Sequence, residues 1–247
     1  MANPHRQFVI AIPCVRGPET VRAVKVVNTP LLCVPSCEAS EFRKLNPKAC
    51  GIIEYGDERL DPSDARNWIA KHWRDSDVWI LDPDVVSVRR RWLRPIRTIK
   101  RIAATPVKLS RNTATQAAQA TISIGKACGT YLCGWYAAGS RGAYAPQAPF
   151  RLTGQVGLDS FGLVRGHGLR FDSRVGPYQS HWLSLLNAHR HRTCFVDERF
   201  TVEIKRAASV KLDDAAVVES VRFMREYFGS CADSRRTSER IGVKLPY

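Results

Sequence analysis

Two carboxylates, Asp82 and Asp84, flank a proline directly after the apolar run 78–81. If that run is a buried parallel strand, both acids follow its carboxyl end, where open α/β sheets bind their ligands. Carboxylate oxygens suit magnesium or manganese, so the pair could hold a divalent ion on a diphosphate and stabilise a leaving nucleoside diphosphate. The structural alternative is an Asp-Pro-Asp turn that simply ends a strand.

Strands and helices must alternate to position these acids, and the first 86 residues predict that alternation. Apolar, β-branched runs predict strands over residues 8–12, 31–34, 51–54 and 78–81. Helical spacing predicts a short helix over 38–45 and another over 64–73, which Ser63 would cap. Continuous apolar strands between helices indicate a parallel sheet covered on both faces.

The regular alternation of predicted strands and helices ends after residue 86. Residues 89–111 are strongly basic, and residues 139–149 are rich in Gly, Ala and Pro, as in a loop. The other predicted elements are helices over 111–126, 178–189 and 213–228 and strands over 131–137 and 194–196. The sequence has no evident repeat or long linker. We therefore expect one α/β domain with a first half (1–86), a basic segment (87–127) and a second half (128–247).

Charge is unusual in amount and in placement. The chain carries 38 Lys and Arg against 23 Asp and Glu, a net charge of +15. Residues 85–158 contain no acid, yet twelve basic residues lie between Arg89 and Arg151. A large, localised positive charge is typical of proteins that bind nucleic acid. The alternative is charge that serves only solubility.

Cysteine spacing and hydropathy indicate an intracellular protein. None of the eight cysteines forms a CxxC pair, and several lie in apolar segments, so we expect reduced thiols in a cytoplasm. A zinc site from Cys33, Cys37 and a distant histidine is the alternative. Apolar runs stay far below the ~20 residues of a membrane helix, so no membrane association is expected.

The order of these segments resembles the GT-A-type glycosyltransferases, which have a Rossmann-like mixed sheet flanked by helices. The similar pieces are FVIAIPCVRGPET, EFRKLNP, SDARNWIAKHW and VWILDPDV, so the likeness covers residues 8–86 and, more loosely, 128–200. More narrowly, they resemble the TET-associated glycosyltransferases of bacteriophages, which act on hydroxymethylated pyrimidines in DNA. The resemblance implies a metal-dependent enzyme that uses a nucleotide sugar.

Several roles follow from this resemblance by position. Asp82 and Asp84 would form its DxD motif and hold Mn or Mg on the diphosphate of a UDP-sugar. Pro13 and Arg16 would lie near the uracil and the diphosphate. Arg66 and Asn67 would face the nucleotide, and Arg66 could meet a phosphate bidentately. The alternative for Arg66 and Asn67 is a surface or capping role.

The sequence departs from the family at the late helix, where these enzymes usually place an acid. Residues 176–182 contain no carboxylate. His181 could act as the general base, since its ordinary pKa lies near working pH, and Asp172 could do the same or orient it. The alternative for both is a solvated loop position. The stereochemical course, retaining or inverting, stays open.

The basic segment after the DxD motif is the predicted DNA-binding region. Its members are Arg89, Arg90, Arg91, Trp92, Arg94, Arg97, Lys100 and Arg101. Closely spaced cations neutralise phosphates, and Trp92 could stack on a base. The alternative is a solvent-exposed basic helix.

The sequence therefore predicts transfer of a sugar to the hydroxymethyl group of 5-hydroxymethylcytosine or hydroxymethyluracil in DNA, in a host cytoplasm if the chain is phage-encoded. The sugar, the base and the oligomeric state stay open, as does a protein or small-molecule acceptor. Two alternatives are a nucleotidyltransferase and a nucleic-acid-binding module without catalysis.

Overall fold

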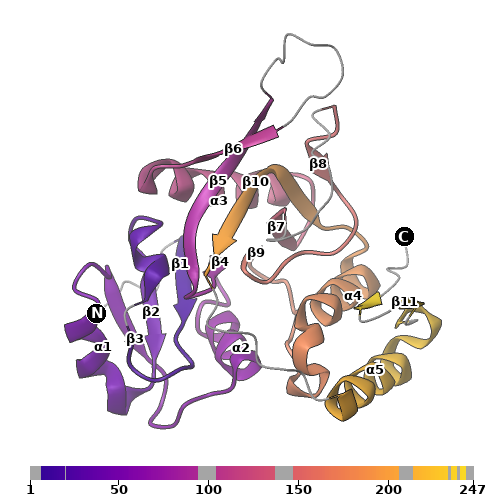
Figure 1. Cartoon of the computed structure of the whole chain (residues 1–247), viewed down its shortest axis with the longest axis horizontal. Coiled ribbons are helices and arrows are strands. Elements are labelled where there is room, and N and C mark those ends of the chain that lie inside the picture. Colours follow the sequence, from indigo (N-terminus) through magenta and orange to yellow (C-terminus); the bar gives the residue numbers. More distant parts are fainter. Residues whose placement is uncertain are drawn as a thin grey trace.

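A mixed β-sheet forms the centre of the computed structural model, which describes residues 7–19, 21–93, 104–136, 147–205, 214–232, 235–237 and 240–242. Its strand order is β3-β2-β1-β4-β9-β7-β10-β5-β6, with β8 beside β10 (Figure 1). The strands are β1 (Phe8–Pro13), β2 (Leu31–Val34), β3 (Gly51–Glu54), β4 (Asp77–Leu81), β5 (Val85–Leu93), β6 (Ala104–Lys108), β7 (Leu132–Tyr136), β8 (Phe150–Arg151), β9 (Ser160–Leu163) and β10 (Phe195–Ile204). A small separate hairpin joins β11 (Arg235–Thr237) to β12 (Arg240–Gly242).

Helices connect and flank these strands. They are α1 (Ala39–Leu45), α2 (Pro62–His72), α3 (Arg111–Ala127), α4 (Gln179–His191) and α5 (Asp214–Phe228), with 3-10 turns η1 (Arg22–Lys25), η2 (Ser36–Glu38), η3 (Ser173–Tyr178) and η4 (Gly229–Ala232). An α/β fold with a mixed sheet is therefore confirmed.

The first half forms the parallel part of the sheet, as predicted. Strands β3, β2, β1 and β4 are parallel neighbours, with Ala11 of β1 opposite Leu31 of β2 and Ile80 of β4. Alternate residues of β1 point to opposite faces. Ile10 packs in one core cluster, while Val9 and Ala11 pack in another. Both faces of the sheet are thus covered.

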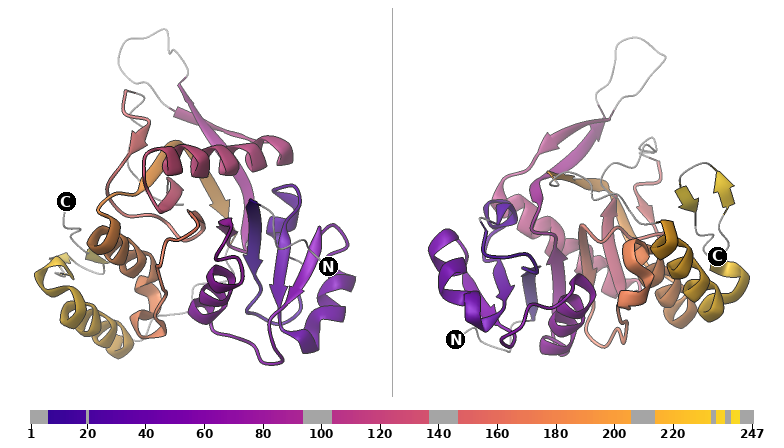
Figure 2. Two further views of the ribbon diagram at one scale, coloured as in Figure 1. Left: turned by 180° about the vertical axis from the view of Figure 1, so that it is seen from behind. Right: turned by 60° about the horizontal axis from the view of Figure 1, so that its bottom comes forward.

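Different helices cover the two faces. Helix α3 contributes Ala118 and Ile122 to the cluster that contains Trp79, and Figure 2 shows it crossing the strands when the molecule is seen from behind. Helices α2 and α4 pack on the other face through residues such as Ile69 and Leu183. Trp73, at the end of α2, is buried in this second cluster. Trp68 is half-buried against the same cluster.

The start of α2 differs from its prediction. Asp61, not Ser63, is the N-cap: its side chain accepts hydrogen bonds from the backbone N–H groups of Ser63 at 2.6 Å and Asp64 at 3.1 Å. Pro62 takes the first helical position, where a missing N–H costs nothing and the fixed φ suits the helix. The predicted start at residue 64 was therefore wrong: the helix begins at Pro62, two residues earlier.

The long strand β10, from the second half of the chain, ends beside the DxD motif. The first part of β10 pairs parallel with β7, and its second part pairs antiparallel with β5 after a register shift between Asp197 and Thr201. Lys205, just past β10, donates its backbone N–H to the carbonyl of Asp84 at 3.1 Å. The β5–β6 hairpin therefore starts at the DxD motif and projects beyond the other strands (Figures 1 and 2).

The eight cysteines are free, as expected. Cys33 is fully buried, whereas Cys37 is exposed and donates to the carbonyl of Asp57 at 2.9 Å, so the two do not share an environment. Within the described ranges, no helix has the length and apolarity needed to cross a membrane.

Candidate functional site

A cavity of about 120 Å³ lies where β1 and β4 end, and we call it the edge cavity. It brings together segments that are far apart in the sequence, because parallel neighbouring strands deliver their carboxyl ends to one sheet edge. The lining residues are Pro13, Val15, Arg16, Pro62, Arg66, Asp82 and Pro83. Four predicted site residues, Pro13, Arg16, Arg66 and Asp82, thus share one cavity.

The two DxD carboxylates are held by local and distant partners. Asp82 Oδ1 accepts the backbone N–H of Asp84 at 2.9 Å, which fixes the turn. Asp84 is 9% exposed, and its Oδ2 accepts a hydrogen bond from Arg16 Nη1 at 2.9 Å. A carboxylate this buried needs such a partner, because an unpaired buried charge is strongly destabilising. These bonds occupy one oxygen of each carboxylate.

Arg66 places a cation in the same cavity. Burial lowers the pKa of its guanidinium, while the negative charges of Asp82 and Asp159 oppose that effect. Its Nε is buried without a hydrogen-bond partner. A buried N–H group without an acceptor is costly, and an anion bound in the cavity would supply one. Arg66 is therefore placed to bind a negatively charged ligand.

Asp159 is a third acid at this edge, and the sequence reasoning missed it. Its backbone carbonyl accepts the Asp82 N–H at 3.0 Å, directly before β9 pairs with β4 with Ser160 opposite Leu81. Its charge also acts on Arg66. The sequence offered one signal, since Asp159 is the first acid after the acid-free stretch 85–158.

Asp82 and Asp84 fit a metal that binds together with a phosphate ligand. Among the described residues, no group of three or more His, Cys, Asp or Glu side chains is arranged to hold an ion alone. Magnesium, however, is often bound by one or two carboxylates, with substrate phosphates and waters as its other ligands. The two DxD carboxylates match that pattern. The cavity is also smaller than typical ligand pockets of about 300–1,000 Å³, so it suits one charged group rather than a whole nucleotide.

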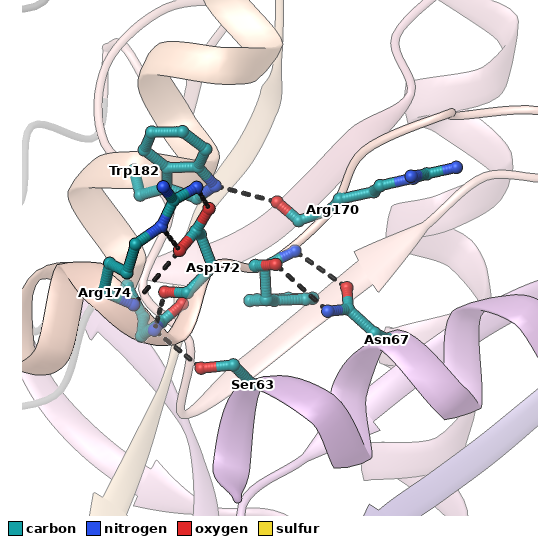
Figure 3. Close-up of polar contacts among 8 residues, drawn as sticks. Ser63, Asn67, Arg170, Asp172, Arg174 and Trp182 are labelled. Atoms are coloured by element: carbon teal, nitrogen blue, oxygen red, sulfur yellow. Dashed lines mark hydrogen bonds and ion pairs between the residues drawn. The ribbon is translucent and has the colours of Figure 1, made fainter. Parts of the chain in front are cut away.

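Asn67 does not line the edge cavity with Arg66. Its Nδ2 donates to the carbonyl of Phe171 at 3.0 Å, and its Oδ1 accepts the Phe171 N–H at 2.8 Å (Figure 3). This pair of bonds ties α2 to the segment after β9. The contacts favour a positioning role for Asn67 over the predicted contact with a nucleotide.

Asp172 is engaged by Arg174. Oδ1 accepts Arg174 Nε at 2.9 Å and Oδ2 accepts Nη2 at 2.7 Å (Figure 3). These bonds lower the pKa of the Asp172 carboxyl. A carboxylate with a lowered pKa and both oxygens occupied is a weak proton acceptor. Its environment favours a structural role at the start of η3 over that of a general base.

His181 lies in the first turn of α4 and has a buried Nδ1 without a hydrogen-bond partner. Burial lowers the pKa of its imidazole, which favours the neutral form of the ring. On the same turn, Gln179 Nε2 donates to Ser63 Oγ at 2.7 Å and to the carbonyl of Asp172 at 2.6 Å. The start of α4 is thereby tied to the start of α2, beside the segment that carries Arg66.

Four of the predicted DNA-binding residues, Arg89 to Trp92, belong to strand β5, so over these described residues the alternative of a basic helix is wrong. Arg89 pairs with Glu203 at 2.7 Å, and the Arg91 guanidinium lies 4.3 Å from the centre of the Tyr136 ring. Successive strand residues point to opposite faces, so Arg90 faces away from both. Trp92 belongs to β5 by its backbone, but its side chain is not described. Outside the described residues lie Arg94, Arg97, Lys100 and Arg101.

Comparison with known proteins does not assign the chain to a family. No protein-family model matches it, and no curated protein matches it with significant similarity. The likeness to GT-A-type glycosyltransferases stays a prediction, and the case for a function rests on the geometry of the edge cavity.

Proposed function

We propose that the chain is a metal-dependent glycosyltransferase that moves a sugar from a UDP-sugar to the hydroxymethyl group of a modified pyrimidine in DNA. The observation that carries this proposal is the edge cavity. It joins two arginines, Arg16 and Arg66, to Asp82 of the DxD motif, and Arg16 also contacts Asp84. Paired acids beside cations suit a metal-bound diphosphate.

The two arginines would bind the donor diphosphate. Arg66 has a buried Nε that lacks an acceptor, and a guanidinium can hold phosphate oxygens bidentately. The Arg16 side chain is 54% exposed, so it can turn from Asp84 to a phosphate. That movement would free Asp84 Oδ2 for a cation. A divalent ion bound there with the donor would neutralise charge on the leaving nucleoside diphosphate.

The acceptor DNA would bind along the β5–β6 hairpin. Asp84 is followed directly by Val85, the first residue of β5, so the basic strand starts at the donor site. Arg90 lies close to that start, and Arg89 would contribute its charge on leaving Glu203. DNA phosphates would release counterions on binding these arginines. The target base would then need to leave the stack or present its hydroxymethyl group in the major groove.

The transfer also needs an acceptor for the hydroxyl proton. Asp159 is one candidate, because its backbone carbonyl accepts the Asp82 N–H and its charge acts on Arg66. Asp172 is less suited, because both of its oxygens accept hydrogen bonds from Arg174. His181 is the other candidate, since its neutral ring offers Nδ1. Replacement of Asp159 by Asn should distinguish the two, because only a true base carries the pH dependence of turnover.

A thermal-shift screen of nucleotide sugars with and without manganese tests the donor site first. We expect one UDP-sugar to raise the melting temperature only when the metal is present. Mass spectrometry of hydroxymethylated DNA after incubation with that donor then tests transfer. If no nucleotide sugar shifts the melting temperature while DNA still binds tightly, the enzyme proposal fails.

A nucleic-acid-binding module without catalysis is the second candidate. The observation that favours it is the Asp172–Arg174 pair, which leaves the late helix without a free acid near its start. Such a module would bind DNA with a steep salt dependence and would ignore sugar nucleotides. A nucleotidyltransferase would instead release pyrophosphate, which a phosphate assay distinguishes from a nucleoside diphosphate.

A further inference from the structure

A second and larger cavity, of about 770 Å³, lies at the other end of α2, and we call it the basic cavity. Pro62 and Arg66, near the start of α2, line the edge cavity, whereas Lys71 and Arg74, at and just beyond its end, line the basic cavity. An eleven-residue helix is roughly 16 Å long, so the two cavities are separate sites.

In the part of the chain that the structure describes, every charged residue that lines the basic cavity is a cation. Its walls consist of Asn67, Ala70, Lys71, Arg74, Gly166, His167, Gly168, Leu169, Arg170 and Arg190, which come from α2, the segment after β9 and the end of α4. Asp75 pairs with Arg74 at 3.3 Å, but both side chains are at least 80% exposed, so this pair neutralises little charge. Cations near a helix C-terminus are favourable without a ligand, yet Arg170 does not belong to a helix.

The segment after β9 is held in a fixed shape around this cavity. Side chains from α2, α4 and the segment itself bind its backbone: Asn67 to Phe171, Arg190 to the Gly168 carbonyl, His191 Nε2 to the His167 carbonyl at 2.7 Å, and the Leu169 N–H to His167 Nδ1 at 2.9 Å. Gly166 and Gly168 have φ values of 80° and 61°, which side chains with a Cβ rarely adopt. The cavity wall is therefore preorganised.

The contacts of the segment leave its polar side chains available to a ligand. Because His167 Nδ1 accepts the Leu169 N–H, the proton of the neutral ring lies on Nε2 and makes it a donor. Arg170 gives only its backbone carbonyl to Trp182 Nε1 at 2.8 Å, and its side chain points away from the Asp172–Arg174 pair (Figure 3).

We propose that the basic cavity binds phosphoryl groups of a nucleic acid, as a contact separate from the DxD site and independent of the proposed glycosyl transfer. Several cations without a lining acid, together with a neutral donor, match the multiple acceptor oxygens of phosphates. The cavity volume of about 770 Å³ lies within the range typical of ligand pockets, about 300–1,000 Å³. Phosphodiesters of a DNA strand and a free pyrophosphate share this chemistry, and the test separates them.

Amide NMR with two probes localises the binding. In metal-free buffer, duplex DNA should shift the backbone signals of Gly166, Gly168 and Arg170. If inorganic pyrophosphate shifts the same signals, the cavity accepts free phosphates. If only DNA does so, the cavity requires a phosphodiester strand. If neither probe moves these signals, the proposal is overturned.

Charge reversal measures the contribution to affinity. Lys71→Glu/Arg170→Glu should weaken DNA binding at least tenfold and lower the salt slope by roughly 2, one unit for each phosphate contact removed. The matched control, Lys44→Glu/Lys48→Glu, makes the same change in net charge at exposed positions in and just after α1. Equal losses for the two double variants would show a general charge effect and overturn the proposal. Lys71→Gln/Arg170→Gln repeats the test if the acidic variant does not fold.

Discussion

The two cavities at the ends of α2 differ in the charges of the residues that line them. The edge cavity balances Arg16 and Arg66 against acids, and Asp84 is already paired within the protein. Among the described residues that line the basic cavity, the charged ones are all cations. A balanced site attracts a neutral combination, such as a metal with a diphosphate, whereas a purely cationic site attracts phosphates directly. Under the two proposals, one helix presents two anion sites that differ in their need for a metal.

Removal of the Asp84 carboxylate should have the largest effect. It should lower the activity of the edge cavity and leave DNA binding at the basic cavity unchanged. We expect Asp84→Ala to lower metal-dependent turnover by about 10²–10³-fold, the usual cost of losing one preorganised electrostatic contact. DNA affinity should be unchanged, because the basic cavity and the β5 arginines remain. Steady-state kinetics across a manganese titration, with anisotropy for DNA, checks both parts. Full activity in this variant would rule out the metal assignment.

Lowering the pH should reduce the stability of the folded protein through His167, which lines the basic cavity. Burial, and then the charge of His191, lower the pKa of His167 from 6.5 to about 4. Between these values the unfolded chain binds a proton that the folded chain does not, so stability falls as the pH drops from about 6.5 to 4. The full loss is on the order of 3 kcal/mol.

Urea unfolding at several pH values measures this dependence. His167→Gln should flatten the curve in that window. Asp172, whose pKa is lowered from 3.8, loses its stabilising effect only at more acid pH. An unchanged slope in His167→Gln would contradict the assignment.

Loss of the Arg66 guanidinium should affect the edge cavity alone. Arg66→Met removes the cation and the Nε that lacks a partner. Affinity for the nucleotide sugar should fall about 10–100-fold, as expected for charged hydrogen bonds, while the melting temperature stays equal or rises. Calorimetric titration with the donor found by thermal shift checks this. Arg174→Met, which alters a cation outside the cavity, is the control and should leave donor affinity intact.

A smaller effect is expected when the hydrogen bonds between Asn67 of α2 and the backbone of Phe171 are broken. Asn67→Ala breaks two hydrogen bonds to Phe171 and leaves buried backbone groups without partners, so the free energy of unfolding should fall by about 1–3 kcal/mol. Urea denaturation measures it, and the exposed Lys71→Ala should stay within about 0.5 kcal/mol. If Asn67→Ala lowers donor affinity without loss of stability, Asn67 contacts the nucleotide, as the sequence first predicted.

Local patterns predicted most of the elements because they depend on nearby residues. The strands over 31–34 and 51–54 are found at the same residues, and the helix predicted over 111–126 is one residue longer. The N-cap of α2 was predicted at Ser63, although Asp61 and Pro62 precede it in the sequence. The prediction overlooked that proline favours the first position of a helix. The basic strand β5 was left without a predicted element because its arginines hide the alternating pattern.

The sequence by itself determined the parallel half of the sheet, the DxD motif at its edge and the concentration of positive charge, since these follow from composition and short-range spacing. Only the tertiary structure decided which side chains meet. The Arg16–Asp84 pair joins residues 68 positions apart, and the Asn67–Phe171 bonds join residues 104 apart. The basic cavity and the position of Asp159 likewise depend on antiparallel pairing of β9 with β4. Contacts between distant segments are set by the whole packing of the sheet and its helices, which no local pattern encodes.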